Sequence, residues 1–229
     1  MLAALGKNLD EIVFLEHLER GVIYFESTWL SNDDFRYYHE EGIRLKEKYR
    51  GKIKVGIGVE VGYNPQQCHE LKDFLQQYAW DRVGISYHFL KINDRFVNMV
   101  SRKKSNLDLM EEIGLDAIIE QYYRGLHAAV ELLDGTMVCH LDAVSRHHPL
   151  INQCNERPDL IQQLLDAIAA KKMAIEVNTS GFAIRDEPFP GRRWLREAMA
   201  RNIPLVAGSD AHRPDDVGRY FDRLKDYRV

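Results

Sequence analysis

Six short apolar segments of this sequence are each followed by a polar residue that could bind a metal ion. The segments span residues 12–15, 53–59, 82–87, 136–139, 173–177 and 203–207, and the polar residues are, in the same order, His17, Glu60, His88, His140, Asn178 and Asp210. Imidazole and carboxylate groups are ligands of Zn, Mn and Fe, and a carboxylate can bridge two ions. Such a centre would lower the pKa of a bound water and stabilise an oxyanion.

Glu60 gives the sharpest indication of a metal site. It ends the apolar segment 53–59, where burying a carboxylate is costly unless a cation or hydrogen-bond donors meet it. A buried glutamate paired with an arginine is the alternative interpretation. Asp210 and His212 follow segment 203–207 as an Asp-x-His pair, which could instead cap the next turn. Each histidine taken singly is weak evidence, and the prediction depends on the whole set.

The segments between these apolar runs have helical periodicity, most clearly at 66–80, about 108–133 and 158–172. Strands that alternate with amphipathic helices predict βα units and parallel strands that are buried on both sides. In a closed barrel all strand ends converge on one rim, whereas in an open sheet the strands near the switch point supply the site. Because all six strands carry a polar residue at this end, the pattern favours an α/β barrel.

Length and composition limit the class of protein. The 229 residues, with 45% apolar and 29% charged, predict a folded chain, which we interpret as one domain over residues 1–229. A net charge of −4 argues against a nucleic-acid partner, and no apolar run reaches the roughly 18 residues of a membrane span. The N-terminus lacks a signal-peptide pattern, and Cys68, Cys139 and Cys154 form no CxxC pair. We therefore expect a cytoplasmic protein with reduced thiols.

Arg146 and Arg185 are candidate substrate-binding residues. They follow the strand-end residues His140 and Asn178 on segments that should overhang the rim. A guanidinium group offers planar, bidentate donors that suit a phosphate. A surface ion pair is the alternative for each arginine.

The order of these motifs resembles a known family. FLEH (14–17), GVEVGY (58–63), GISYHF (84–89), VCHLDAV (138–144), EVNTSG (176–181) and AGSDAH (207–212) are similar to successive motifs of the PHP (polymerase and histidinol phosphatase) superfamily. Within it, the chain most resembles the PHP-type histidinol phosphatases over nearly its whole length. The resemblance implies a distorted (β/α)7 TIM-like barrel with a trinuclear centre of Zn, Mn or Fe.

The resemblance also implies roles for particular residues. Glu60 would bridge two ions, and His88 and His140 would hold the second ion with it. The first ion would be served by Asp210, and the third would be held by His17 and His212. The catalytic set would then comprise Glu60, Asp210 and His212, with Arg146 and Arg185 gripping the phosphate.

The implied activity is that of a phosphoric monoester hydrolase of histidine biosynthesis. A metal-bound hydroxide would attack the phosphorus of L-histidinol phosphate, giving L-histidinol and phosphate while the ions neutralise the developing charge. The expected partner is thus a small phosphorylated substrate.

One departure from the family concerns the start of the chain. The family normally opens with a strand carrying His-x-His, whereas Met1 begins within the helix expected after it. We therefore expect six strands of seven, unpaired edges on the two neighbouring strands, fewer than three bound ions and weak hydrolysis. Three explanations are open: a misplaced start, a degenerate relative, or a strand supplied by another chain. We favour the first because every later motif is intact.

Two other functions stay open at this point. The chain could act on another small phosphate, such as a nucleotide, or it could be an inactive PHP module kept for partner binding. An amidohydrolase barrel would want a lysine at a mid-barrel strand end for carbamylation, and none of the six ends has one.

Overall fold

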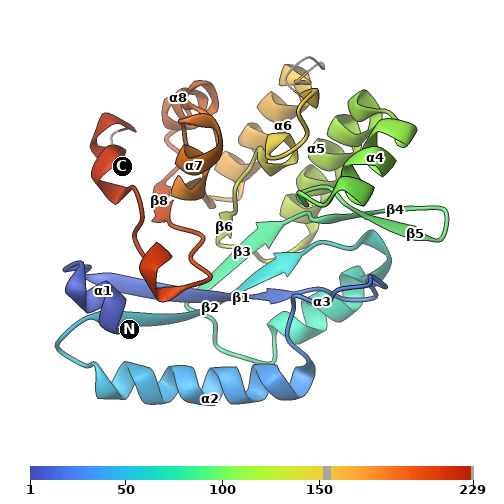
Figure 1. Cartoon of the computed structure of the whole chain (residues 1–229). Helices are drawn as coiled ribbons and strands as arrows, with labels where there is room; N and C mark the ends of the chain where they lie inside the picture. The colour runs from blue at the N-terminus through green and yellow to red at the C-terminus, as the bar shows by residue number, and fades with distance from the viewer. Residues whose placement is uncertain (152–155, 228–229) are drawn as a thin grey trace.

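Six parallel strands form one sheet that curls as part of a barrel (Figure 1). The computed structural model describes residues 1–151 and 156–227. The strand order is β1-β2-β3-β6-β7-β8, and the strands are β1 (Glu11–Leu18), β2 (Lys54–Gly62), β3 (Arg82–Ser86), β6 (Met137–Val138), β7 (Ala174–Asn178) and β8 (Leu205–Gly208). The α/β class and all six predicted strands are confirmed. The single-domain interpretation of residues 1–229 stays a prediction.

Helices make every crossover between successive strands of this sheet, as parallel pairing requires. Helix α1 (Leu2–Gly6) precedes the first strand, and the crossover helices are, in chain order, α2 (Asn32–Lys48), α3 (Cys68–Leu75), α4 (Lys104–Ile113), α5 (Leu115–Leu132), α6 (Pro158–Ala170), α7 (Phe182–Arg185) and α8 (Arg192–Ala200). Helix α2 lies along β1 and β2, while α4 to α8 line the other strands (Figure 1). Local signals fix several helix starts: Ser31 and Asp34 form a capping box before α2, and Pro158 opens α6.

The structure differs from the predicted elements in three places. The helix expected over about 108–133 is broken into α4 and α5 at Gly114, whose φ of 100° lies outside the helical region. The helix expected over 66–80 is shorter, because a 3-10 turn at Pro65–Gln67 precedes α3 and the helix ends at Leu75. A hairpin of β4 (Phe89–Ile92) and β5 (Arg95–Asn98) occupies part of the long interval between His88 and His140.

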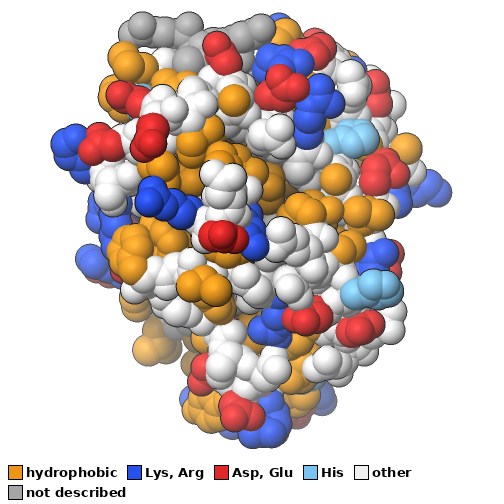
Figure 2. All heavy atoms as spheres, turned by 90° about the vertical axis from the view of Figure 1, so that its right-hand side faces the viewer, with side chains coloured by type: hydrophobic (Ala, Val, Ile, Leu, Met, Phe, Trp, Pro, Cys, Tyr) orange, Lys and Arg blue, Asp and Glu red, His pale blue; other side chains and the backbone are white. Residues whose placement is uncertain are grey.

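The rim beside this hairpin is covered by the segment that follows β1. Residues 19–31 form neither helix nor strand, but the rings of Tyr24 and Trp29 pack on Phe89 of β4, with centroids 5.1 and 5.8 Å away. Phe25 is 69% exposed, and Lys103 Nζ lies 4.3 Å from its ring centroid. Figure 2 views this side of the molecule, where hydrophobic side chains lie interspersed with charged ones. The segment after β1 is therefore held on the hairpin through aromatic contacts with β4.

The two edges of the sheet are β1 and β8. Residues 12–17 of β1 and all of β8 are partly exposed, whereas residues 55–62 of β2 are buried. Near the start of β1, Ala4 of α1 packs with Ile53 and Val55, and Val217 from the segment after β8 joins this cluster. The segment beyond one edge strand thus reaches the helix that precedes the other.

Two further expectations concern the thiols and the membrane. Cys68 and Cys139 are free thiols, as predicted, and Cys154 lies outside the described residues. Across residues 1–151 and 156–227, no helix has the length and apolar character needed to cross a membrane.

Helix α2 approaches β2 closely at Gly42. A Cβ atom on Gly42 would lie 2.6 Å from Ile57 Cγ1, which is shorter than any ordinary van der Waals contact. Tyr38, one turn earlier, donates its hydroxyl hydrogen towards the carbonyl oxygens of Phe14 and Gly58, which lie 3.0 and 2.9 Å away. The helix is therefore fixed on the β1–β2 pair by both packing and hydrogen bonding.

We predict that Gly42→Ala destabilises the protein, although the same change inside a helix ordinarily stabilises by about 0.5–1 kcal/mol. Overpacking against Ile57 should cost about 1–3 kcal/mol of unfolding free energy, measured by urea denaturation. In an Ile57→Ala background the space is open, so the added methyl should become stabilising. A stabilising effect of Gly42→Ala in the wild-type background would contradict the close contact.

Candidate metal centre

The carboxylate of Glu60 lies between three imidazole rings that come from different parts of the chain. Glu60 is near the end of β2 and is 8% exposed. Its Oε1 atom lies 3.1 Å from His88 Nε2 and 3.0 Å from His140 Nε2, while its Oε2 atom lies 3.9 Å from His17 Nδ1. The two oxygens of one carboxylate therefore face different histidines, which is the arrangement that a bridging ligand requires.

The histidine nitrogens converge closely enough to share a cation. His88 Nε2 and His140 Nε2 lie 3.5 Å apart beside the same Glu60 oxygen. One ligand atom each of His17, Glu60 and His88 lie within 4.8 Å of one another. His140 Nδ1 is buried without a hydrogen-bond partner among the described residues. This nitrogen and carboxylate donor set fits a divalent ion such as zinc or manganese.

Strand register and one sharp turn place these side chains. His17 of β1 pairs directly with Glu60 of β2 in the parallel ladder, so their side chains share a face of the sheet. His140 follows β6 with a φ of 24°, and its backbone N–H donates to Glu176 Oε2 at 3.0 Å. Because a Cβ atom on Gly208 of β8 would lie 1.9 Å from Glu176 Oε1, the glycine leaves room for this buried carboxylate.

The ionisation of Glu60 and His88 reflects their mutual contacts. Burial alone would raise the pKa of Glu60, but His17, His140 and His88 hold it well below its ordinary value. Burial would likewise lower the pKa of His88, and its contacts with Glu19 and Glu60 reverse this and raise the pKa to about 10. Without a metal ion, a protonated imidazole thus compensates the buried carboxylates. A divalent cation would take over that compensating role.

Asp210 follows β8 and faces an arginine. Its Oδ2 atom lies 3.0 Å from Arg146 Nη2, which also donates to Ser180 Oγ at 3.1 Å. Burial raises the pKa of Asp210, but the guanidinium of Arg146, followed by His140, outweighs burial and lowers the pKa to about 2. Arg146 therefore reaches the end of β8 from its loop, and its partner there is a predicted metal ligand.

His212 is the most open of the predicted ligands. Its ring centroid lies 6.0 Å from that of His17, its side chain is 70% exposed, and its Nδ1 atom lies 3.1 Å from the carbonyl oxygen of Asp210. The described chain therefore brings His17, Glu60, His88 and His140 into one cluster, with Asp210 and His212 beside it.

Arg185 has a different set of partners. Its Nη2 atom donates to Asp142 Oδ2 at 2.8 Å and to the carbonyl oxygen of Pro188 at 2.6 Å, and its Nη1 atom donates to Ser145 Oγ at 3.0 Å. The guanidinium carbons of Arg146 and Arg185 lie 4.9 and 3.9 Å from the centre of the Phe189 ring. The two arginines thus meet at one aromatic ring, but Arg185 is bound to Asp142 rather than to the Glu60 cluster.

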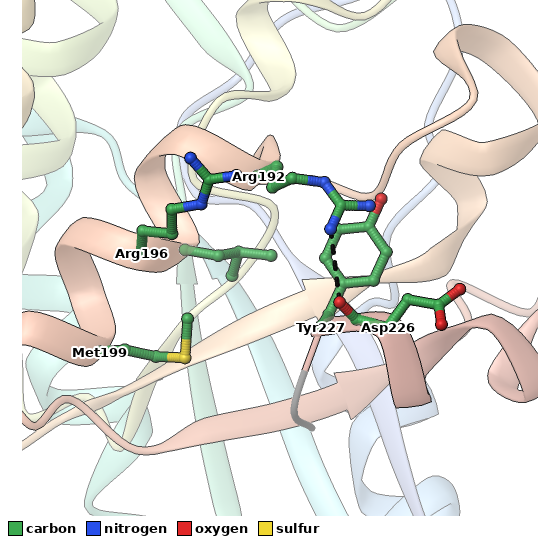
Figure 3. A pocket seen from close by; sticks show the side chains of 6 residues that line it. Arg192, Arg196, Met199, Asp226 and Tyr227 are labelled. Carbon is green, nitrogen blue, oxygen red and sulfur yellow. Dashed lines mark hydrogen bonds between the residues drawn. The ribbon is translucent and has the colours of Figure 1, made fainter.

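Two hollows of the surface lie away from the Glu60 cluster. One of about 390 Å³ is lined by Asp142, Arg185 and Trp194 among others. Another, of about 310 Å³, lies between α8 and the C-terminal 3-10 helix (Phe221–Tyr227), where Arg192 donates to the carbonyl oxygen of Asp226 at 3.3 Å (Figure 3). Neither is lined by the Glu60 cluster. Convergence of donor atoms, rather than concavity, therefore identifies the candidate centre.

Two buried glutamates of this site were not predicted from the sequence. Glu19, which is 4% exposed, places Oε1 2.9 Å from His88 Nδ1, and Glu176 holds the turn at His140. A signal existed for both. Glu19 follows His17 by two residues, and Glu176 interrupts an apolar strand in the same way as Glu60 does.

Comparison with known proteins identifies the family. The profile of the PHP domain matches residues 1–180. This chain belongs to the PHP domain family. A second profile, described as PHP-associated, matches residues 192–225 of the same PHP protein.

Relatives and solved structures agree with this assignment. The histidinol-phosphatase of Bacillus subtilis (strain 168) is 29% identical over 239 residues, which cover 96% of this PHP chain and 88% of the relative. A Listeria monocytogenes structure has a TM-score of 0.86 at 20% identity and covers 97% of this chain and 91% of that one. The structure of histidinol phosphate phosphatase from Lactococcus lactis, complexed with Zn, L-histidinol and phosphate, has a TM-score of 0.73 at 22% identity. The match covers 99% of this chain and 85% of the Lactococcus chain. The two structures establish the shared fold.

We predict that Arg146→Met makes the metal-free PHP protein less stable, and increasingly so as the pH rises. In the wild type the pKa of Asp210 is lowered from its ordinary value of 3.8 to about 2. The ionised carboxylate therefore stabilises the fold fully at pH values above 3.8, and this stabilisation is lost as the pH falls towards 2. Removing the guanidinium leaves a largely buried carboxylate without its cation and with the Ser180 hydroxyl beside it, which should cost up to roughly 3–5 kcal/mol at pH 7.5.

At pH 5 this cost should be smaller, because burial then raises the pKa of Asp210 and protonation relieves the unpaired charge. Urea unfolding with a chelator at both pH values measures the effect. The double variant Arg146→Met with Asp210→Asn is the control and should recover stability at pH 7.5. An equal cost at both pH values would show that Asp210 does not depend on Arg146.

Proposed function

We propose that this PHP protein is a metal-dependent phosphomonoesterase that hydrolyses L-histidinol phosphate to L-histidinol and phosphate. The observation that carries the proposal is the placement of the Glu60 oxygens, one facing His88 and His140 and the other facing His17. The substrate is suggested by the name of the Bacillus relative and by the L-histidinol and phosphate held in the Lactococcus structure. We further propose that it acts in the cytoplasm on this small phosphorylated substrate.

The ligands are assigned from the oxygen that each histidine faces. His88, His140 and Oε1 of Glu60 would hold one divalent ion, and His17 with Oε2 of Glu60 would contribute to a second. Asp210 lies on the same rim, directly after β8, and would complete the coordination, while His212 beside it is kept for proton transfer. When bound, divalent ions supply Lewis acidity, which lowers the pKa of a coordinated water and neutralises charge on a phosphate.

The protein's own side chains would bind and orient the substrate. Arg146 has one buried Nε–H without a partner among the described residues and a guanidinium next to Asp210, so it is placed to donate to phosphate oxygens. Arg185 supports the same loop through Asp142 and Phe189 and would orient Arg146 at their shared ring. A phosphate that approaches Arg146 would compete with the carboxylate of Asp210.

His212 is placed to move a proton. Its Nδ1 atom lies beside the carbonyl oxygen of Asp210, so Nδ1 carries the hydrogen and Nε2 is the nitrogen left to accept or donate a proton. Because the side chain is 70% exposed on the rim, Nε2 can exchange protons with water. We assign it to proton transfer at the leaving alcohol oxygen.

We predict that a chelator abolishes the hydrolysis of L-histidinol phosphate and that added Zn²⁺ or Mn²⁺ restores it. The assay measures the inorganic phosphate released. Glu60→Gln should lower kcat/KM by more than about 100-fold, since even the partners of metal ligands are worth 10–100-fold. Glu16→Gln is the matched control, because Glu16 precedes His17 on β1 and points to the opposite face of the strand.

The same assay with nucleoside phosphates tests the substrate. A hundredfold preference for a nucleotide would contradict histidinol phosphate as the substrate. The assignment as a phosphomonoesterase would still hold. Activity that is indifferent to the chelator, or a Glu60→Gln variant as active as the wild type, would contradict the metal centre.

A further inference from the structure

The carboxylate of Glu19 lies against a nitrogen of His88 that faces away from Glu60. Glu19 follows directly after β1 and is 4% exposed. Its Oε1 atom lies 2.9 Å from His88 Nδ1, while Nε2 of the same ring lies 3.1 Å from Glu60 Oε1. A donor hydrogen on Nδ1 leaves the Nε2 lone pair free for a cation. The contact therefore sets both the tautomer and the direction of the ring.

A missing side chain on the neighbouring strand makes room for this carboxylate. A Cβ atom on Gly62, at the end of β2, would lie 2.0 Å from Glu19 Oε1 and 2.1 Å from Glu19 Cδ. Gly62 is not among the glycines with positive φ, so its backbone conformation would accept any L residue. Space, and not conformation, therefore requires glycine at this position.

We propose that Glu19 is a positioning residue that orients His88 as a metal ligand, and that Gly62 is required because it leaves space for the Glu19 carboxylate. The inference rests on the proposed metal-dependent function and deepens it. A carboxylate that accepts from the second nitrogen of a ligating histidine holds the ring in place and raises its basicity as a ligand. Glu19, Gly62 and His88 are far apart in the sequence, but the parallel pairing of β1 with β2 and of β2 with β3 brings them together.

The test measures zinc affinity by competition with a chromogenic chelator, alongside melting curves with and without zinc. Glu19→Ala should weaken zinc binding by about 10–100-fold. Glu19→Gln should lose less, because its amide oxygen can still accept from Nδ1. The matched control is Glu16→Ala, which removes a carboxylate from the opposite face of β1 and should leave the affinity within about twofold of the wild type.

Variants at Gly62 separate positioning from a general effect of charge. Gly62→Ala should reproduce the Glu19→Ala loss, because the added methyl displaces the Glu19 carboxylate. The double variant Glu19→Ala with Gly62→Ala should be no weaker than either single variant, since both changes remove one contact. Combining Glu19→Ala with Gly62→Asp places a carboxylate in the vacated space and should restore part of the affinity.

The outcomes are distinct for this inference and for the proposed function. A wild-type protein that does not bind zinc or manganese defeats the proposed function. A wild type that binds, together with Glu19→Ala and Gly62→Ala variants that bind equally well, overturns the inference alone. Losses that multiply in the double variant also overturn it. If Glu19→Ala does not give a cooperative melting curve, Gly62→Ala decides, and an affinity equal to that of the wild type contradicts positioning.

Discussion

The buried carboxylate of Glu60 constrains the rest of this structure. An ionised group removed from water must be met by donors or by a cation, and here His88, His140 and His17 surround it on both oxygens. Those rings need partners in turn, and Glu19 supplies one for His88. The Glu60 carboxylate is therefore compensated by histidines from neighbouring strands, and one of those histidines is in turn paired with a further carboxylate. Gly62 leaves room for the carboxylate of Glu19, and Gly208 leaves room for that of Glu176.

Parallel topology explains how so few residues can build such a centre. Each strand contributes through its C-terminal end, so residues far apart in the chain arrive at the same rim without long loops. The turn at His140, which has an unusual positive φ, is held by a carboxylate from the next strand. Backbone strain at the site is thus stabilised by the sheet on which the site is built.

Much of the fold could be predicted from periodicity, and the outcome differed where a single residue decided it. The six strands were predictable because apolar runs end in polar residues, whereas Gly114 divides one predicted helix in two. The hairpin at 89–98 was missed because its strands are short and partly exposed. The Glu60 cluster was found from strand ends. Glu19 was missed although it follows His17 by two residues, because its contact with His88 also depends on the space left at Gly62, which is visible only once β1 and β2 are paired.

The candidate metal centre lies between the two edge strands of the sheet. β1 and β8 share no ladder hydrogen bonds, yet the imidazole of His17, on β1, and that of His212, after β8, lie with their centroids 6.0 Å apart. An ion that drew on both sides of this seam would act as a clasp between the first and last strands of the curled sheet. Cofactor loading and closure of the sheet would then be one thermodynamic event. The amide protons of the two outermost strands would record it as slower exchange with solvent.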